Sequence, residues 1–424
     1  MSSAEFGALI LFLLVLVASA HLLGDLFARL RQPRVIGEIL AGILLGPSLL
    51  HLVAGVNSAP GHAGAELMYN IGLLLLMFLS GAETRRLFRA EDRREVAWLA
   101  LLGTGAPFVA LLIASHWLTF HSLMGPANAR LSLVLVVGIA AAVTSIPVIS
   151  RIFHDLGILQ TRFARLVLSV AVFEDIALWA VLAVATALAK SAVVPRKTIA
   201  LEVALTLVYF VLGLTLMPQV LKRAEAARFN TVARRSAVAW QVIVLFAYVG
   251  VASLLGVNIV FAAFLAGVAV PKSNVQVDEA IRSLHAVSYA AFIPIYFALV
   301  GYKLDLSRMF SWKMLAVFLL GACALKLASV WLAALGAGFG ALERINLAIA
   351  TNARGGPGIV LASVALEAGI ISAPFYTTLI LTAVITSQAA GWWLEFVMRK
   401  GWGLLNSPQS QKELTRANFA DERS

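Results

Sequence analysis

Long apolar runs separated by short polar segments recur along the chain from residue 6 to residue 398. A bilayer core about 30 Å thick needs roughly 20 apolar residues per spanning helix, because an α-helix rises about 1.5 Å per residue. With glycine, proline and charged clusters as boundaries, this pattern predicts thirteen membrane-spanning helices. Their expected ranges are 6–28, 35–52, 66–83, 96–118, 130–150, 164–189, 199–221, 236–255, 258–271, 286–303, 313–337, 345–367 and 374–398.

Composition supports a polytopic membrane protein. Of the 424 residues, 61% are hydrophobic and 13% are charged, and the mean hydropathy is +0.90. A soluble protein of this size would be far less apolar. We therefore expect an all-α membrane protein in which residues 1–400 form the transmembrane domain and residues 401–424 a short polar tail.

The net charge of +11 raises the question of a nucleic-acid partner, and the positions of the basic residues answer it. If the N-terminus lies outside, 24 of the 33 Lys and Arg residues fall in inner segments and 7 in outer segments. This bias is the positive-inside pattern of membrane proteins. The basic residues therefore indicate topology, with the C-terminus in the cytoplasm, and we expect the lipid bilayer rather than nucleic acid as the partner.

The chain offers little for metal or cofactor chemistry. Its single cysteine, Cys323, lies in an apolar run, which excludes a disulfide framework and a thiolate metal site. The seven histidines show no metal-ligand spacing. We expect inert packing for Cys323, no cofactor and no enzymatic activity.

Two predicted spans contain helix-breaking residues. The span 130–150 carries Thr144-Ser145-Ile146-Pro147, and the span 345–367 carries Asn352 to Gly358 with two adjacent glycines and a proline. These spans run in opposite directions in the predicted topology, so the three spans within 96–189 and the three within 313–398 indicate an inverted repeat. Interrupted helices in corresponding halves form the substrate sites of secondary transporters near the midplane. The alternative is a pair of packing kinks.

Four ionisable residues lie inside predicted spans: Glu174 and Asp175 near the middle of 164–189, Lys326 near the centre of 313–337, and Arg354 beside the second break. A charge at the bilayer centre costs about 2.5 to 3.5 kcal/mol, so these side chains should face one another or water. Adjacent helix positions point about 100° apart, so the two acids meet different neighbours. The alternative is a static ion-pair cluster that ties helices together.

A buried acid of this kind has a specific chemical use. Desolvation raises the proton affinity of a carboxylate, and a nearby cation such as Lys326 lowers it. Such a group can hold a proton or a small cation, but not comfortably both. This mutual exclusion predicts exchange of a cation for protons.

Several short stretches, in their order and spacing, form a specific pattern. They are PRVIGEILAGILLGP from Pro33, FLSGAE from Phe78, TSIPVIS from Thr144, FED from Phe173, FLAG from Phe264, PIYFALVG from Pro294 and NARG from Asn352. With these stretches the chain resembles the cation:proton antiporter-2 family of monovalent cation/proton antiporters over essentially its whole membrane length.

The resemblance implies an elevator-type transporter, usually a homodimer, in which a mobile core carries the two crossed discontinuous helices beside a dimerisation domain. It also implies exchange of Na⁺ or K⁺ for H⁺ by residues 1–400 in a bacterial plasma membrane.

The resemblance also implies residue roles. Asp175, the second acid of the pair, takes the place of the carrier of the proton and of the transported monovalent cation, the only metal expected. Glu174 takes the place of an acid paired with a lysine, here Lys326, although the family members with two aspartates have Asp at this position. Arg354 and Glu83 occupy positions that resemble a charge pair in related exchangers.

The remaining expectations concern the broken helices and the alternatives. Thr144 and neighbouring carbonyls are expected to contact the ion, and Glu38 is expected to have a structural role. Two other functions stay open: a cation channel or efflux pore, although no segment resembles a filter loop, and an organic-ion carrier or transport-dead sensor on the same scaffold. The residues expected to form the discontinuities are Ser145, Pro147, Gly355, Gly356 and Pro357.

Overall fold

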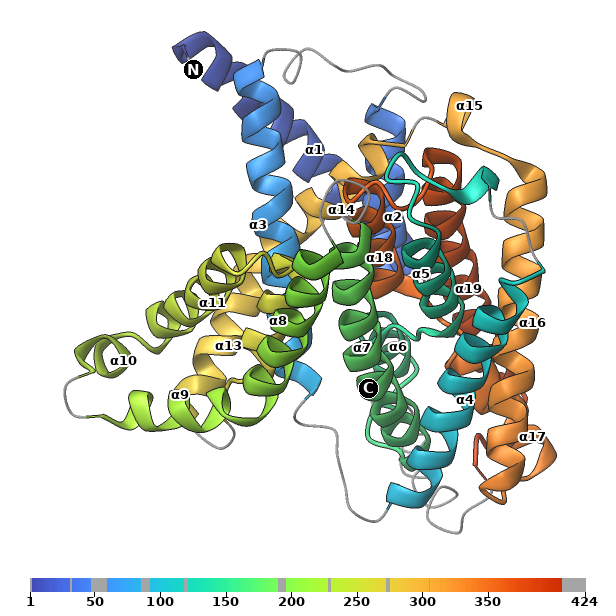
Figure 1. The fold of residues 1–424 in the computed structure, drawn as a ribbon. Coiled ribbons are helices and arrows are strands. Elements are labelled where there is room, and N and C mark those ends of the chain that lie inside the picture. Colours follow the sequence, from blue (N-terminus) through green and yellow to red (C-terminus); the bar gives the residue numbers. More distant parts are fainter. Residues whose placement is uncertain are drawn as a thin grey trace. The chain divides into compact units, whose positions relative to one another are not determined.

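The computed structural model describes residues 2–30, 33–46, 59–84, 92–117, 121–189, 196–227, 230–271, 275–304 and 306–405. In these ranges the chain consists of helices and their connections, with one isolated bridge between Met124 and Ile371 (Figure 1). The chain divides into two compact units. The first comprises residues 1–30, 34–86 and 186–310, and the second comprises residues 31–33, 87–185 and 311–424.

Each of the thirteen predicted ranges contains a helix or a broken helix in the described residues. By length and apolar composition, eight described helices could each cross a membrane, or up to nine if one bent pair counts as a span. Three shorter apolar helices accompany them, and two of these belong to the interrupted spans. The predicted all-α membrane fold is therefore confirmed.

The second unit repeats one order of elements. A long helix, a broken pair and another long helix occur twice, with α4 packed against α16 and α18 packed against α19. This is the arrangement that the inverted repeat predicts. The first set is α4 (Arg93–Ala114), α5 (Arg130–Ala142), α6 (Ile146–Asp155) and α7 (Arg162–Ala189), and the second is α16 (Trp312–Gly336), α17 (Ala341–Ala350), α18 (Gly355–Glu367) and α19 (Ala373–Arg399).

The first break separates α5 from α6. Val143 leaves the helix with an extended backbone, and Ser145 starts α6 as its N-cap, where its hydroxyl accepts a hydrogen bond from the Val148 amide at 3.4 Å. Pro147 lies in the first turn of α6, where a missing N–H costs no helical hydrogen bond. The sequence motif thus both ends one half-helix and starts the next.

The second break separates α17 from α18 and depends on Gly355. Its φ of +33° lies in the left-handed region, and a Cβ added there would lie 2.3 Å from Val148 Cγ2 and 2.6 Å from Ser145 Oγ. Only glycine fits both the backbone conformation and this close approach of the two breaks.

Gly355→Ala is expected to lower the free energy of unfolding by about 1 to 3 kcal/mol, because the new methyl group overlaps Val148 and the backbone must change. Thermal unfolding of the detergent-purified protein measures this loss. Gly358→Ala is the matched control, since a Cβ there would meet Arg354 Cβ at 3.4 Å and Ala383 Cβ at 3.8 Å, which are ordinary contacts. Equal stabilities of the two variants would contradict this account of the second break.

A polar cluster joins the start of α4 to the start of α7. The Asp92 carboxylate accepts hydrogen bonds from Arg165 Nε at 2.8 Å and from Arg162 Nε at 3.2 Å. A further bond joins Arg162 Nη2 to Glu95 Oε1 at 3.1 Å. Burial acts to raise the pKa of Asp92, but the hydrogen bonds and charges of Arg165 and Arg162 outweigh it, and the pKa is lowered from its ordinary value.

This shift predicts the sign of an acid effect. Because the pKa of Asp92 is lower in the folded protein than in the unfolded chain, its stabilising contribution is complete above the ordinary aspartate pKa of about 4 and is lost as the pH falls through the folded value. The difference in thermal unfolding midpoint between the wild type and Asp92→Asn should therefore be largest near pH 6 and should shrink below about pH 4. A difference that grows on acidification would contradict the assignment.

The first unit contains the remaining helices. α12 packs against α3, and α2 packs against both α1 and α14. These contacts are close: a Cβ on Gly267 would lie 1.9 Å from the Phe78 carbonyl oxygen, so small residues bring the backbones together. The elements are α1 (Ser3–Arg29), α2 (Arg34–Leu45), α3 (Ala59–Thr84), α8 (Arg196–Thr215), α9 (Met217–Ala226), α10 (Thr231–Arg235), α11 (Ala237–Leu254), α12 (Ile259–Val268), α13 (Val275–Val287), the π-helical turn η4 (Ser288–Phe292), α14 (Ile293–Tyr302) and α15 (Leu306–Met309).

Two spans of the first unit differ from their expected shapes. The helix predicted at 286–303 starts at Val275, because α13 is amphipathic and carries charges that interrupt the apolar pattern. The span predicted at 199–221 bends by 47° between α8 and α9. Pro218 in the first turn of α9 accounts for the bend, since it removes a backbone donor at this point.

Candidate ion-binding site

The two breaks meet in the second unit and hydrogen-bond to each other. The Ser145 amide donates to the Ala353 carbonyl at 2.6 Å, and the Thr144 hydroxyl donates to the Thr351 carbonyl. Thr144, Ser145 and Thr351 have no exposed surface. The discontinuities predicted from the sequence therefore form one buried crossing, in which backbone groups freed by one break find partners in the other.

Hydroxyl groups of α19 satisfy other freed amides of the second break. The Arg354 amide donates to Thr386 Oγ1 at 3.3 Å, and the Gly355 amide donates to Ser387 Oγ at 3.2 Å. Both hydroxyls in turn donate to carbonyls of their own helix. The sequence prediction did not include Thr386 and Ser387, although two adjacent hydroxyl residues within an apolar span were a usable signal.

The C-terminus of α5 binds both basic residues of the site. Arg354 donates from Nε to the Ala140 carbonyl and from Nη2 to the Ala141 carbonyl, each at 3.0 Å. Lys326 Nζ donates to the Ala142 carbonyl at 2.5 Å. The last carbonyls of a helix lack helical partners and carry partial negative charge, so this end stabilises cations. The break in the first span thus creates the binding place for Lys326 and Arg354.

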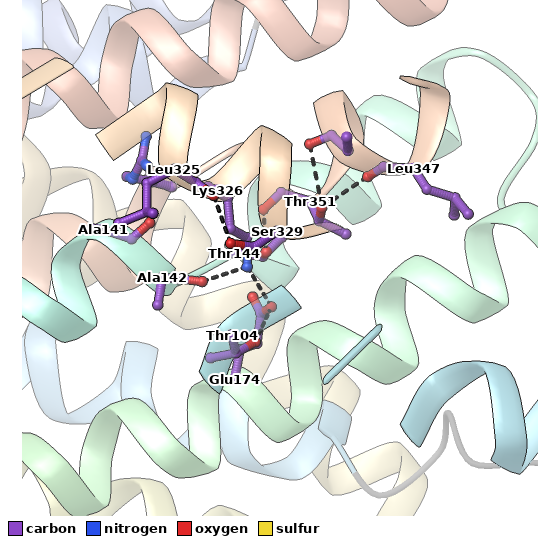
Figure 2. A network of polar contacts seen from close by, with 12 residues as sticks. Thr104, Ala141, Ala142, Thr144, Glu174, Leu325, Lys326, Ser329, Leu347 and Thr351 are labelled. Atoms are coloured by element: carbon purple, nitrogen blue, oxygen red, sulfur yellow. Dashed lines mark hydrogen bonds and ion pairs between the residues drawn. The ribbon is translucent and has the colours of Figure 1, made fainter. Parts of the chain in front are cut away.

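Lys326 also forms the predicted ion pair with Glu174 (Figure 2). Lys326 Nζ lies 2.5 Å from Glu174 Oε1, and both side chains have no exposed surface. Thr104 on α4 donates its hydroxyl hydrogen bond to the same oxygen at 2.5 Å. Thr104 was missed by sequence reasoning because a lone threonine between apolar residues gives no pattern. Three helices, α4, α7 and α16, therefore meet at this carboxylate.

Asp175 follows Glu174 on α7 and also has no exposed surface. It lies on the buried side of the helix, in line with Ala171, Leu178 and Leu182, which are all at most 1% exposed. The Asp175 carboxyl group therefore lies in the protein interior, away from bulk water. The structure thus places both acids of the pair inside the second unit.

Cys323 takes part in the site, contrary to the expectation of inert packing. It lies one helical turn before Lys326 on α16, and its sulfur accepts hydrogen bonds from Asn352 Nδ2 at 3.3 Å and from Arg354 Nη1 at 3.5 Å. With the two carbonyls of α5, the thiol fixes the guanidinium of Arg354 beside the second break.

The other predicted acids lie in the first unit. Glu38 on α2 is 6% exposed, and Glu83 lies near the end of α3. Arg354 belongs to the second unit, so its predicted pairing with Glu83 stays a prediction. The described residues contain no group of three or more His, Cys, Asp or Glu side chains that could hold a resident metal ion.

Comparison with known proteins identifies the family. The family described as the transmembrane part of the sodium/hydrogen exchanger matches residues 12–400. The chain belongs to the sodium/hydrogen exchanger family. The resemblance to cation/proton antiporters inferred from the short motifs is thereby confirmed for nearly the whole length of this exchanger-family chain.

Individual relatives are similar along the same length. The Na(+)/H(+) antiporter NhaS4 of Synechocystis sp. (strain ATCC 27184 / PCC 6803 / Kazusa) is 27% identical over 392 residues, which cover 88% of this chain and 93% of that protein. The Na(+)/H(+)-K(+) antiporter GerN of Bacillus cereus is 26% identical over 380 residues, covering 88% and 92%. The Cation/H(+) antiporter 18 of Arabidopsis thaliana is 27% identical over 387 residues, but these cover 47% of that protein, so the chain spans about half its length.

A solved structure supports the fold. The sodium proton antiporter MjNhaP1 from Methanocaldococcus jannaschii superimposes with a TM-score of 0.63 at 15% identity, covering 95% of this chain and 100% of that one. At this identity the likeness concerns the fold.

Proposed function

We propose that the chain exchanges a monovalent cation, Na⁺ or K⁺, for H⁺, with Asp175 as the group that carries either one. The observation that carries this proposal is a buried pair of adjacent acids, of which Glu174 forms an ion pair with Lys326. Glu174 Oε1 accepts hydrogen bonds from Lys326 Nζ and from the Thr104 hydroxyl. Asp175, the next residue on α7, is equally buried and is the proposed carrier.

The competition between ions follows from charge. A carboxylate buried in a low-dielectric interior binds a counter-charge strongly, and either a proton or a cation supplies it. When one is bound, the negative charge is neutralised and the other loses its attraction. Inward proton flow therefore drives the cation outward.

Thr144 and the broken backbone are the proposed neutral ligands. The Thr144 hydroxyl donates a hydrogen bond to the Thr351 carbonyl, so the lone pairs of its oxygen point elsewhere and can contact a cation. Oxygen ligands of this kind suit small hard cations, and they require no further acid at the site.

The proposal includes one proton per cation. Lys326 Nζ donates hydrogen bonds to Glu174 and to the Ala142 carbonyl at the negative end of α5. In this proposal Lys326 stays bound to both groups through the cycle and only Asp175 exchanges a proton, so exchange is electroneutral. By analogy with the family, we also propose that the unit containing the crossed helices moves as an elevator. The chain is proposed to work as a homodimer in a bacterial plasma membrane, with its N-terminus outside.

The test is a proteoliposome assay of the whole chain. An acidic interior is imposed, a pH-sensitive dye reports the lumen, and Na⁺, K⁺ and Li⁺ are added outside in turn. We expect Na⁺ or K⁺ to raise the luminal pH through proton efflux, with no response in empty liposomes. Downhill cation flux at channel rates without proton counterflow would instead establish the pore, and exchange that requires an organic ion would establish the organic-ion carrier.

A further inference from the structure

The first unit contains an apolar cleft. It measures about 360 Å³ and lies between the α8–α9 pair and α11, two segments labelled in Figure 1. The α8 side is lined by Leu205, Val208 and Leu212, and the α11 side by Ile243, Ala247 and Val251. Both α8 and α11 pack against α12. At helical spacing, each side presents one continuous apolar stripe to the cleft.

The cleft has the length of a lipid chain. On α11 the lining runs from Trp240 to Leu255, which at 1.5 Å per residue is about 22 Å, more than the roughly 15 Å depth of one hydrocarbon leaflet. The hydroxyl of Tyr209, at the cleft wall, donates to the Tyr248 carbonyl at 2.8 Å. This hydrogen bond satisfies the donor of the Tyr209 hydroxyl. The lining residues of α8 and α11 named above are apolar, so the cleft suits a hydrocarbon chain.

A second, polar cavity of about 250 Å³ adjoins the first, because Trp240 lines both. Its charged lining residues are Lys222 on α9, Glu225 on α9 and Arg234 on α10, two cations against one carboxylate. The first turns of α11 and α13 also contribute, through Ala237 and Val277. Helix N-termini present partly positive amide groups, so the cavity favours an anion.

Gln241 supplies an independent indication of a ligand. Its side chain lines the polar cavity and is 1% exposed, yet its Nε2 donor has no hydrogen-bond partner among the described residues. A buried donor left without an acceptor costs about 1 to 3 kcal/mol in fold stability, so such groups normally have a partner. An oxygen of a bound molecule in the cavity would supply it.

We propose that the two cavities form one binding site for an anionic glycerophospholipid. An acyl chain occupies the cleft between α8 and α11. The phosphate lies between Lys222 and Arg234, and a phosphate or ester oxygen accepts from Gln241. In the topology predicted from the basic residues, residues 222–235 lie at the inner surface of the membrane. Anionic lipid headgroups lie at the same depth, next to the polar cavity. This site is separate from the acid pair and does not depend on the proposed exchange.

Lipid-dependent thermal stability of the full chain in a neutral detergent tests the site. Phosphatidylglycerol should raise the unfolding midpoint more than phosphatidylcholine or phosphatidylethanolamine with the same acyl chains, and native mass spectrometry should detect it bound. Lys222→Gln with Arg234→Gln should weaken phosphatidylglycerol binding by roughly fivefold per removed charge. Gln241→Leu should weaken binding of all three lipids.

The matched control is Arg223→Gln with Arg235→Gln, which removes the same charge from the same two helices at positions that do not line the cavity. This pair should keep the preference for phosphatidylglycerol. Ala247→Trp, which fills the cleft, should reduce binding whatever the headgroup. Equal stabilisation by all three lipids, or an equal loss of the preference in the control pair, would overturn the proposal.

Discussion

Asp175→Asn is expected to abolish cation-evoked proton movement and to leave the fold intact. An asparagine has nearly the same size but binds neither a proton nor a cation at this position, so the exchange rate should fall to the level of empty liposomes. A charge within a membrane span costs about 2.5 to 3.5 kcal/mol on insertion scales. Removing the charge of a fully buried carboxyl group should therefore keep or raise the thermal unfolding midpoint.

Two measurements distinguish a carrier from a structural residue. In the dye assay, Asp175→Asn should give no response to Na⁺ or K⁺. In unbuffered detergent solution, cation addition should release protons from the wild type and none from the variant. Asp25→Asn is the matched control, because Asp25 forms an exposed ion pair with Arg34 and such pairs contribute little. Full exchange by Asp175→Asn would remove Asp175 from the mechanism.

The membrane spans and the two helix breaks were predictable because they follow from local sequence patterns. Apolar runs predicted the spans, and the residues around Pro147 and Gly355 predicted the two breaks, since the limits of proline and glycine backbones act locally. The cost of burying a charge predicted that the ionisable side chains inside spans face one another or water, and the family resemblance implied the pairing of Glu174 with Lys326. The structure places this pair at 2.5 Å.

The partners that complete the site were not predictable in the same way. Thr104, Thr386 and Cys323 are single polar residues within apolar helices, and their hydrogen bonds join positions 31 to 70 residues apart in sequence. Such contacts depend on helix rotation and crossing, which an apolar run does not encode. The start of α13 at Val275 was missed for a related reason, because amphipathic helices lack the continuous hydropathy of a span.

The structure also changes how the buried cations are understood. From the sequence, Lys326 was expected to pair with Glu174, and Arg354 with Glu83. In the structure Lys326 contacts Glu174, both basic residues donate to the last carbonyls of α5, and Arg354 has Cys323 as a further acceptor. The partial negative charge of an interrupted helix thus shares in neutralising them.

Breaking the Glu174–Lys326 pair on one side is expected to cost more stability than removing it entirely. Glu174→Gln or Lys326→Met each leaves a buried charge without its counter-charge, at a cost of about 3 to 5 kcal/mol in the free energy of unfolding. The double variant removes both charges and should lose much less. Thermal unfolding of the four proteins gives the coupling between the two side chains as a double-mutant cycle.

The same variants decide the role of Lys326 in transport. If the pair only positions helices α7 and α16, the double variant should retain slower exchange, and exchange by the wild type should not respond to an imposed membrane potential. If Lys326 releases a proton in each cycle, wild-type exchange should accelerate or slow with the potential, and Lys326→Met should lose that response. Lys326 Nζ donates to Glu174 and to the Ala142 carbonyl, and loss of the ammonium charge would weaken both contacts, so we expect the first result.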